Sequence, residues 1–132
     1  MTVQKMTSKA SLPYHASALS LGYDIFSSEE GIIMPKSGRV IQTDICIKLP
    51  LGSVIKITGR SGSALKNIHV SGSEFDSNYC EPIKVLLFNH GNEPFLVLEK
   101  MRIAKIIVSR LLVPPISVGR NIGALDFPAL GN

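Results

Sequence analysis

Apolar and polar residues alternate along most of the chain, a pattern typical of strands with one buried face. The clearest example spans residues 39–50, where every second position from 41 is apolar or threonine: Ile41, Thr43, Ile45, Ile47 and Leu49. Other short apolar segments, bounded by Gly, Pro or Asn, lie at 23–25, 32–34, 54–57, 83–89, 95–98 and 102–113. The pattern predicts an all-β sandwich or barrel with at most one short helical turn, at 64–67.

The two ends of the chain lack this pattern. Residues 1–11 are polar, and after Pro114-Pro115 the sequence is rich in Gly and Pro with no strand or helix period. We therefore expect a flexible N-terminus over 1–11, one β domain over 12–115, and an arm or loop over 116–132. A length of 132 residues fits a single domain.

Composition narrows the classes of function. The net charge of +4 suits a phosphate-bearing ligand, but the clustered Lys and Arg of a nucleic-acid-binding face are missing. The longest apolar run, 103–113, is interrupted by Lys105 and Arg110 and is too short to span a bilayer. Cys46 and Cys80 are predicted to be free thiols in a reducing compartment, so we expect an intracellular protein of the cytoplasm or nucleus.

The connection that precedes the apolar strand at 83–89 carries an acidic and an aromatic residue, Asp76 and Tyr79. A carboxylate held at such a turn can accept a proton from an attacking water, and a tyrosine three residues later can pack on a flat ligand. Asp, Ser and Asn are also ordinary turn formers, so a plain polar hairpin is the alternative.

A second candidate site is the segment from Gly59 to Ser63, which contains Arg60, Ser61 and Gly62. Backbone amides of a glycine-rich turn, a hydroxyl and a guanidinium can together hold a phosphate oxygen. The alternative is a surface turn with a solvated arginine. The three histidines show no metal-ligand spacing.

Four segments, in order and spacing, resemble the motifs of the trimeric dUTPases over about residues 12–115. The segment Leu21-Gly22-Tyr23-Asp24-Ile25 is similar to the first motif, residues 59–64 to the second, residues 73–79 to the third, and Arg102-Ile103-Ala104 to the fourth. Four partial matches in sequence order are much more specific than any one of them.

The resemblance implies a jelly-roll homotrimer, with active sites where subunits meet, that hydrolyses dUTP to dUMP and pyrophosphate with Mg²⁺. It assigns to Asp76 the activation of the water that attacks the α-phosphorus, and to Tyr79 the packing against the deoxyribose. Asp24 would hold Mg²⁺ through a water. The remaining residues would contact the phosphates or the base: Arg60, Ser61, Gly62, Gly72, Arg102 and Lys105.

The third, fourth and fifth motifs depart from the family pattern. Ser73 replaces a glycine, Glu74-Phe75 replaces Val-Ile, and Lys105 replaces a glutamine. The fifth motif, a glycine-rich arm that closes over the substrate, either has degenerate remnants at Arg120 and Phe127 or is absent. A second function therefore stays open, in which a catalytically impaired jelly roll acts as a protein-interaction module, similar to some virally encoded relatives.

Overall fold

The computed structural model describes residues 1–59 and 66–121, and within them every regular element is a strand. The strands are β1 (Thr2–Lys5), β2 (Tyr23–Phe26), β3 (Gly31–Ile33), β4 (Ser37–Gln42), β5 (Ile45–Lys48), β6 (Ser53–Thr58), β7 (Ile68–Ser71), β8 (Ser73–Asp76), β9 (Lys84–Asn89), β10 (Phe95–Val97) and β11 (Arg102–Arg110). The all-β prediction is confirmed. Across the described ranges, no helix is long and apolar enough to cross a membrane.

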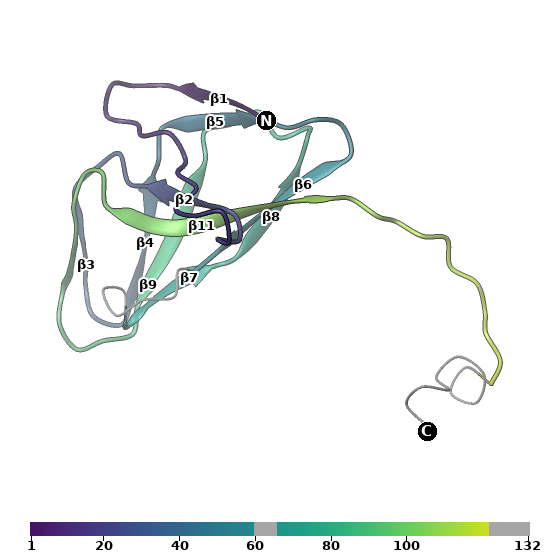
Figure 1. The fold of residues 1–132 in the computed structure, drawn as a ribbon. Helices are drawn as coiled ribbons and strands as arrows, with labels where there is room; N and C mark the ends of the chain where they lie inside the picture. Colours follow the sequence, from purple (N-terminus) through teal and green to yellow (C-terminus); the bar gives the residue numbers. More distant parts are fainter. Residues whose placement is uncertain (60–65, 122–132) are drawn as a thin grey trace.

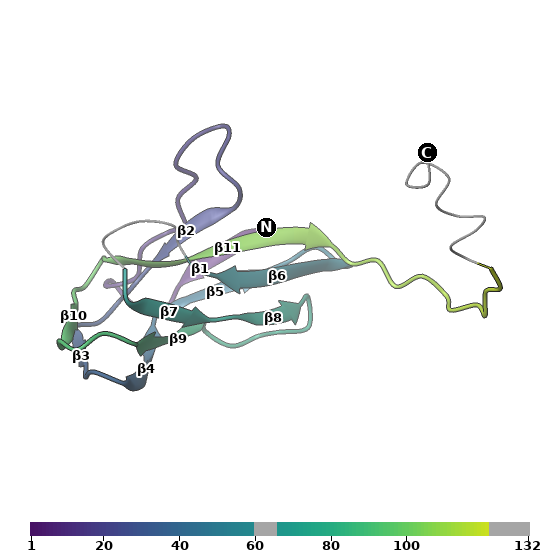
Figure 2. The ribbon, with the colours of Figure 1, turned by 90° about the horizontal axis from the view of Figure 1, so that it is seen from below.

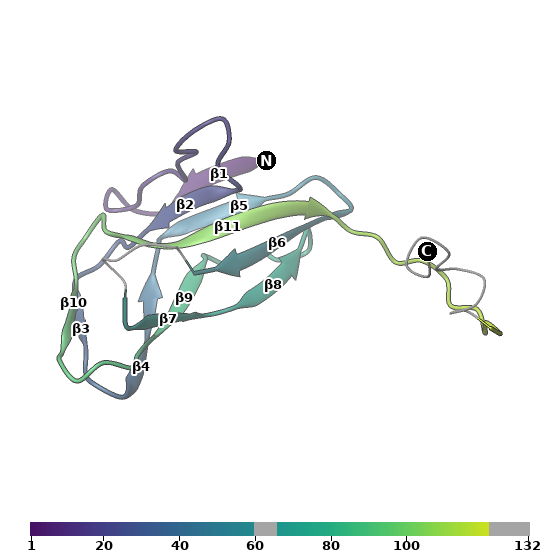
Figure 3. The ribbon, with the colours of Figure 1, turned by 60° about the horizontal axis from the view of Figure 1, so that its bottom comes forward.

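Antiparallel pairing joins the described strands into four sheets. A four-stranded sheet has the order β2-β11-β6-β8, and a three-stranded sheet has the order β4-β9-β7. The pair β1-β5 (Figure 1) and the pair β10-β3 complete the body. Seen from below and from an oblique angle, the two larger sheets enclose one interior (Figures 2 and 3). Branched aliphatic residues of both sheets fill it, among them Ile55, Ile57, Ile106, Ile41, Val85 and Leu87.

The alternating segment at 39–50 forms two strands instead of one. Its five predicted core residues are all buried, so the assignment of the inner face is confirmed. The ladder breaks at Asp44, which has a φ of 53° and turns the chain between β4 and β5. Because of this corner, β4 pairs with β9 whereas β5 pairs with β1.

Both ends of the chain differ in part from the expectation. Residues Thr2–Lys5, expected to be irregular, form strand β1 on the edge of β5. The predicted strand at 102–113 ends at Arg110. Beyond it the chain leaves the body as an extended segment (Figure 1), in which Leu112, Ile116 and Val118 are almost fully exposed. The domain boundaries at 11 and 115 stay a prediction.

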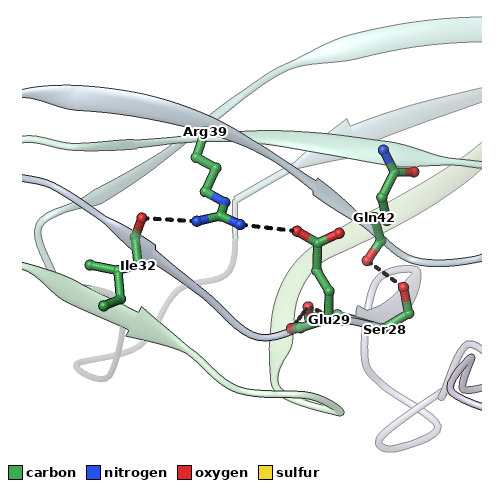
Figure 4. A network of polar contacts seen from close by, with 6 residues as sticks. Ser28, Glu29, Ile32, Arg39 and Gln42 are labelled. Atoms are coloured by element: carbon green, nitrogen blue, oxygen red, sulfur yellow. Dashed lines mark hydrogen bonds and ion pairs between the residues drawn. The ribbon is translucent and has the colours of Figure 1, made fainter.

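A polar network fixes the connection between β2 and β4 (Figure 4). The Arg39 guanidinium donates to the Ile32 carbonyl at 3.3 Å and lies 3.7 Å from the Glu29 carboxylate. It also covers Gly31, where a Cβ would collide with the guanidinium carbon. Ser28 Oγ donates to the Gln42 carbonyl at 3.0 Å. These contacts hold β3 and the segment that precedes it against β4.

Candidate functional site

A β-bulge gathers the first group of site residues on one face of the four-stranded sheet. Asp24 lies opposite Lys105, and Arg102 lies opposite Phe26, two residues from Asp24. Arg102 and Lys105 are three residues apart and in a regular strand would point to opposite faces. The register shift between Arg102 and Ala104 removes this difference, so both basic residues and Asp24 share the outer face.

Asp24 is only 6% exposed, although it lies on the face opposite the fully buried Ile25. Its Oδ2 lies 3.5 Å from Nη1 of Arg102, whose guanidinium also lies 5.6 Å from the centre of the Tyr14 ring. Asp24 therefore points away from the apolar core and is nevertheless shielded from solvent. The segment that carries Tyr14 covers the carboxylate.

A cavity of about 140 Å³ opens beside this ion pair. Its lining is polar or small: Tyr14, Ala16, Ser20, Gly22, Asp24, Arg102 and Lys105. Paired hydrogen bonds hold Tyr14 there, because its N–H donates to the Asp24 carbonyl at 2.9 Å and its carbonyl accepts from the Asp24 N–H at 2.8 Å. Sequence reasoning missed Tyr14 and Ser20, which belong to an irregular segment with no hydrophobic period.

Gly22 makes the close approach of this segment to β11 feasible. Its φ is +77°, in the left-handed region that disfavours residues with a side chain. A Cβ at this position would also overlap the Ile106 carbonyl, at less than the 3.0 Å that real Cβ atoms keep. The glycine of the first motif thus has a steric reason.

Asp76 is the last residue of β8, and Tyr79 lies on the turn that follows. Oδ1 of Asp76 accepts from the Asn78 N–H at 2.9 Å, and the Asp76 carbonyl accepts from the Tyr79 N–H at 3.2 Å. The Tyr79 ring packs on Phe75 with 4.4 Å between centroids, and its hydroxyl donates to the Pro82 carbonyl at 3.4 Å. The turn therefore fixes the orientation of both side chains.

The pKa of the Tyr79 hydroxyl is raised above its ordinary value of 10.0. Partial burial of the phenol is the main cause, because it disfavours the phenolate. Electrostatic interactions with Glu81 and with Cys46 act in the same direction. Tyr79 is therefore a neutral hydrogen-bond donor at physiological pH.

Within one chain, the residues around Asp24 lie apart from Asp76 and Tyr79. Lys105 lies opposite Thr58 on β6, whereas Asp76 lies opposite Val54, four residues further along the same strand. At ~3.4 Å per residue, this places Asp76 about 14 Å along the sheet from Lys105. The outer face is shared, but the cavity at Asp24 is lined by neither Asp76 nor Tyr79.

The other predicted site residues are placed only in part. Arg60, Ser61, Gly62 and Phe127 lie outside the described residues, as does the first half (64–65) of the helical turn expected at 64–67. Gly72 is exposed between β7 and β8, and Arg120 is exposed on the extended C-terminal segment. In the described ranges, no three His, Cys, Asp or Glu side chains gather as a metal-ligand set. Any metal there would need other ligands, such as phosphate oxygens and water.

The fold and site define an antiparallel jelly roll that presents one carboxylate and two basic side chains around a small polar cavity. The dUTPase family model matches residues 8–132. The deoxyuridine 5'-triphosphate nucleotidohydrolase of Fowlpox virus is 36% identical over 133 residues, with 100% of this chain and 92% of that protein covered. The enzyme of that name from Oryza sativa is 34% identical, with 94% and 73% covered. The chain belongs to the dUTPase family.

Solved structures agree on the fold. The dUTPase of phage phi11 of S. aureus superposes with a TM-score of 0.81 at 19% identity, over 91% of this chain and 96% of that one. The Staphylococcus bacteriophage 80alpha dUTPase superposes with a TM-score of 0.80, also at 19% identity and with the same coverage. The jelly-roll prediction is confirmed.

Proposed function

We propose that the protein is a dUTP diphosphatase, which hydrolyses dUTP to dUMP and pyrophosphate. The observation that carries the proposal is the bulge in β11, which brings Arg102 and Lys105 to the same face as the covered carboxylate of Asp24. A regular strand would have turned one of the two cations inward. Membership of the dUTPase family supplies the substrate.

In this mechanism Asp76 accepts a proton from the water that attacks the α-phosphorus. The side chain suits the role because it is exposed at the end of a paired strand, and because a backbone N–H orients its Oδ1. The orientation lowers the entropic cost of placing the carboxylate beside the water. The reaction then needs charge stabilisation more than covalent chemistry by the protein.

The phosphate end of the substrate would lie at the cavity beside Asp24. Mg²⁺ fits this donor set, since the ion usually takes one or two carboxylates together with substrate phosphates and water. Bound there, it would neutralise charge on the triphosphate. Asp24 would hold it through a water, and Arg102 and Lys105 would contact phosphate oxygens. Arg60, Ser61 and Gly62 are proposed as further phosphate ligands on the basis of the second motif.

The nucleoside end would lie at the turn after β8. The Tyr79 ring would pack against the deoxyribose and exclude a ribose hydroxyl, while backbone near Gly72 would read the uracil edge. Contact with Phe75 holds the Tyr79 ring in one orientation, which favours such packing. Glu74 does not enter this contact, because it lies opposite Lys56 on the outer face whereas Phe75 lies opposite the buried Ile55.

The working form is a homotrimer whose sites are shared between copies. Support comes from the ~14 Å between the two halves of the site within one chain. A neighbouring copy that supplies Asp76 and Tyr79 to the Asp24 cavity would close this gap. Further support comes from the exposed apolar residues at 111–118, which are costly to leave in water and suit burial against another copy.

Subunit mixing tests the shared site. Asp24→Asn and Asp76→Asn each keep the shape of the side chain, and each should abolish pyrophosphate release from dUTP. If every site combines Asp24 of one copy with Asp76 of another, trimers refolded from an equal mixture regain about a quarter of the wild-type activity. Mixing that restores nothing, at a trimeric mass, would refute the shared site.

Substrate choice tests the function itself. The wild type should release pyrophosphate from dUTP with Mg²⁺, and should do so far less efficiently from dCTP and UTP. Absence of turnover from dUTP in a folded trimer would refute the diphosphatase and would favour the protein-interaction module.

A further inference from the structure

A second cavity, of about 390 Å³, is lined in part by Tyr79. It is bounded by β1, by β5 and by the turn after β8, and its lining includes Gln4, Cys46, Lys48, Tyr79 and Cys80. The volume falls in the range of small-molecule pockets. Nothing in the proposed reaction uses this cavity, and both cysteines of the chain line it.

The two cysteines come from separate parts of the chain that a backbone hydrogen bond joins. Cys46 lies on β5 opposite Gln4, and Cys80 lies on the turn. The Ile83 N–H donates to the Ile45 carbonyl at 2.8 Å, which ties the chain after the turn to the start of β5. Cys46 follows that tie by one residue and Cys80 precedes it by three, and both line the same cavity.

The chemical state of the two residues suits thiol exchange. Both are free thiols; Cys80 is exposed and Cys46 is half-buried. Lys48 shares the outward face of β5 with Cys46 and lines the same cavity. Exposure makes Cys80 the first thiol that a reagent from solution meets.

We propose that Cys46 and Cys80 are a thiol–disulfide exchange site that takes a small disulfide of the glutathione class. The Cys80 thiolate attacks one sulfur of the reagent, forms a mixed disulfide and releases one thiolate. The Cys46 thiolate then attacks Cys80 Sγ, forms the Cys46–Cys80 bond and releases the second. The protein loses two protons and two electrons, and the reagent is reduced to two thiols.

Formation of this bond alters the turn that carries Tyr79. Cys80 Sγ now donates to the Asn78 carbonyl at 3.2 Å, and this contact is lost when Cys80 is drawn toward β5. The adjacent Tyr79 must then move relative to Phe75 and Pro82, which it contacts. The consequence for dUTP rests on the proposed function, in which Tyr79 packs on the sugar. Oxidation is therefore expected to weaken dUTP binding.

Intact mass and thiol titration of the folded protein test the chemistry. After incubation with oxidised glutathione, the wild type should lose both thiols and about 2 Da, with the bond mapped to Cys46–Cys80. Cys46→Ser should instead stop at one glutathione on Cys80. Two retained thiols, one glutathione on each cysteine, or disulfides only between chains would each overturn the proposal.

Kinetics of the same samples test the link to Tyr79. The oxidised wild type should show a KM for dUTP about threefold higher or more, reversed by dithiothreitol, while Cys46→Ser kept reduced should behave as the reduced wild type. An unchanged KM in the disulfide form would overturn the link. A reduced protein without turnover would count against the proposed function alone, because the mass measurement decides the disulfide independently.

Discussion

Replacement of Gly22 by alanine should destabilise the protein through a collision at the site. Gly22 has a φ of +77°, and its Cα faces the Ile106 carbonyl so closely that a Cβ would overlap it. Gly52 offers a matched control, since its φ is +84° and a Cβ there would have nothing within 4 Å. The two substitutions share the backbone strain and differ only in the collision.

The magnitudes follow from this difference. Left-handed backbone costs an L-residue about 1–2 kcal/mol, partly offset by a less flexible unfolded chain, so Gly52→Ala should cost about 1 kcal/mol or less. Gly22→Ala must also push the segment away from β11, where Tyr23 pairs with Ile106. Loss of two or three ladder hydrogen bonds at ~1 kcal/mol each brings its total to about 3 kcal/mol.

Denaturant unfolding at one fixed protein concentration measures both variants, because the stability of an oligomer depends on concentration. The free energy of unfolding of Gly22→Ala should fall by about 2 kcal/mol more than that of Gly52→Ala. Equal losses would show that the collision is relieved at no cost, and would refute the steric reason for the first-motif glycine.

Three further outcomes can be measured. Asp76→Asn should lower kcat for dUTP by about a hundredfold or more with unchanged melting temperature, and retained turnover would assign the water to another group. Because burial, Glu81 and Cys46 raise the Tyr79 pKa, that phenol should ionise above 10.0 in a spectrophotometric titration. The stability that the Tyr79 phenol contributes is complete below its pKa in the unfolded chain and is lost as the pH rises through its pKa in the folded protein. Constant stability above pH 10 would therefore contradict the raised pKa. Deletion of 119–132 should change kcat/KM less than about threefold, and a tenfold loss at unchanged oligomer mass would restore the closing arm.

Period-two patterning predicted the inner faces of the strands well, because burial of alternate side chains depends mainly on local sequence. It could not predict the corner at Asp44. The apolar alternation continues through this position, and the break arises because β4 and β5 take different partners. The pattern also failed to predict the strand at Thr2–Lys5, because an edge strand with exposed polar residues has no buried face to create an alternation.

In the candidate site, too, the sequence predicted some features, whereas others depend on contacts between distant segments. Motif order was enough to select Asp24, Arg102 and Lys105, but a spacing of three along a regular strand would separate the last two. The bulge that unites them is a property of the pairing between β2 and β11. Burial of Asp24 was likewise hidden, because it depends on Tyr14 and its neighbours, which no hydrophobic period marks.

The acidic replacement in the third motif is less damaging than sequence alone indicates. A carboxylate at Glu74 would repel a triphosphate if it lay beside the phosphates. The register places it opposite Lys56, and both side chains are exposed on the outer face, so their charges offset each other in a cross-strand pair. Lys56 also lies two residues from Thr58 along β6, and Thr58 is the residue opposite Lys105. The charge change is therefore balanced within the sheet, and the proposed phosphate end keeps its excess of cations.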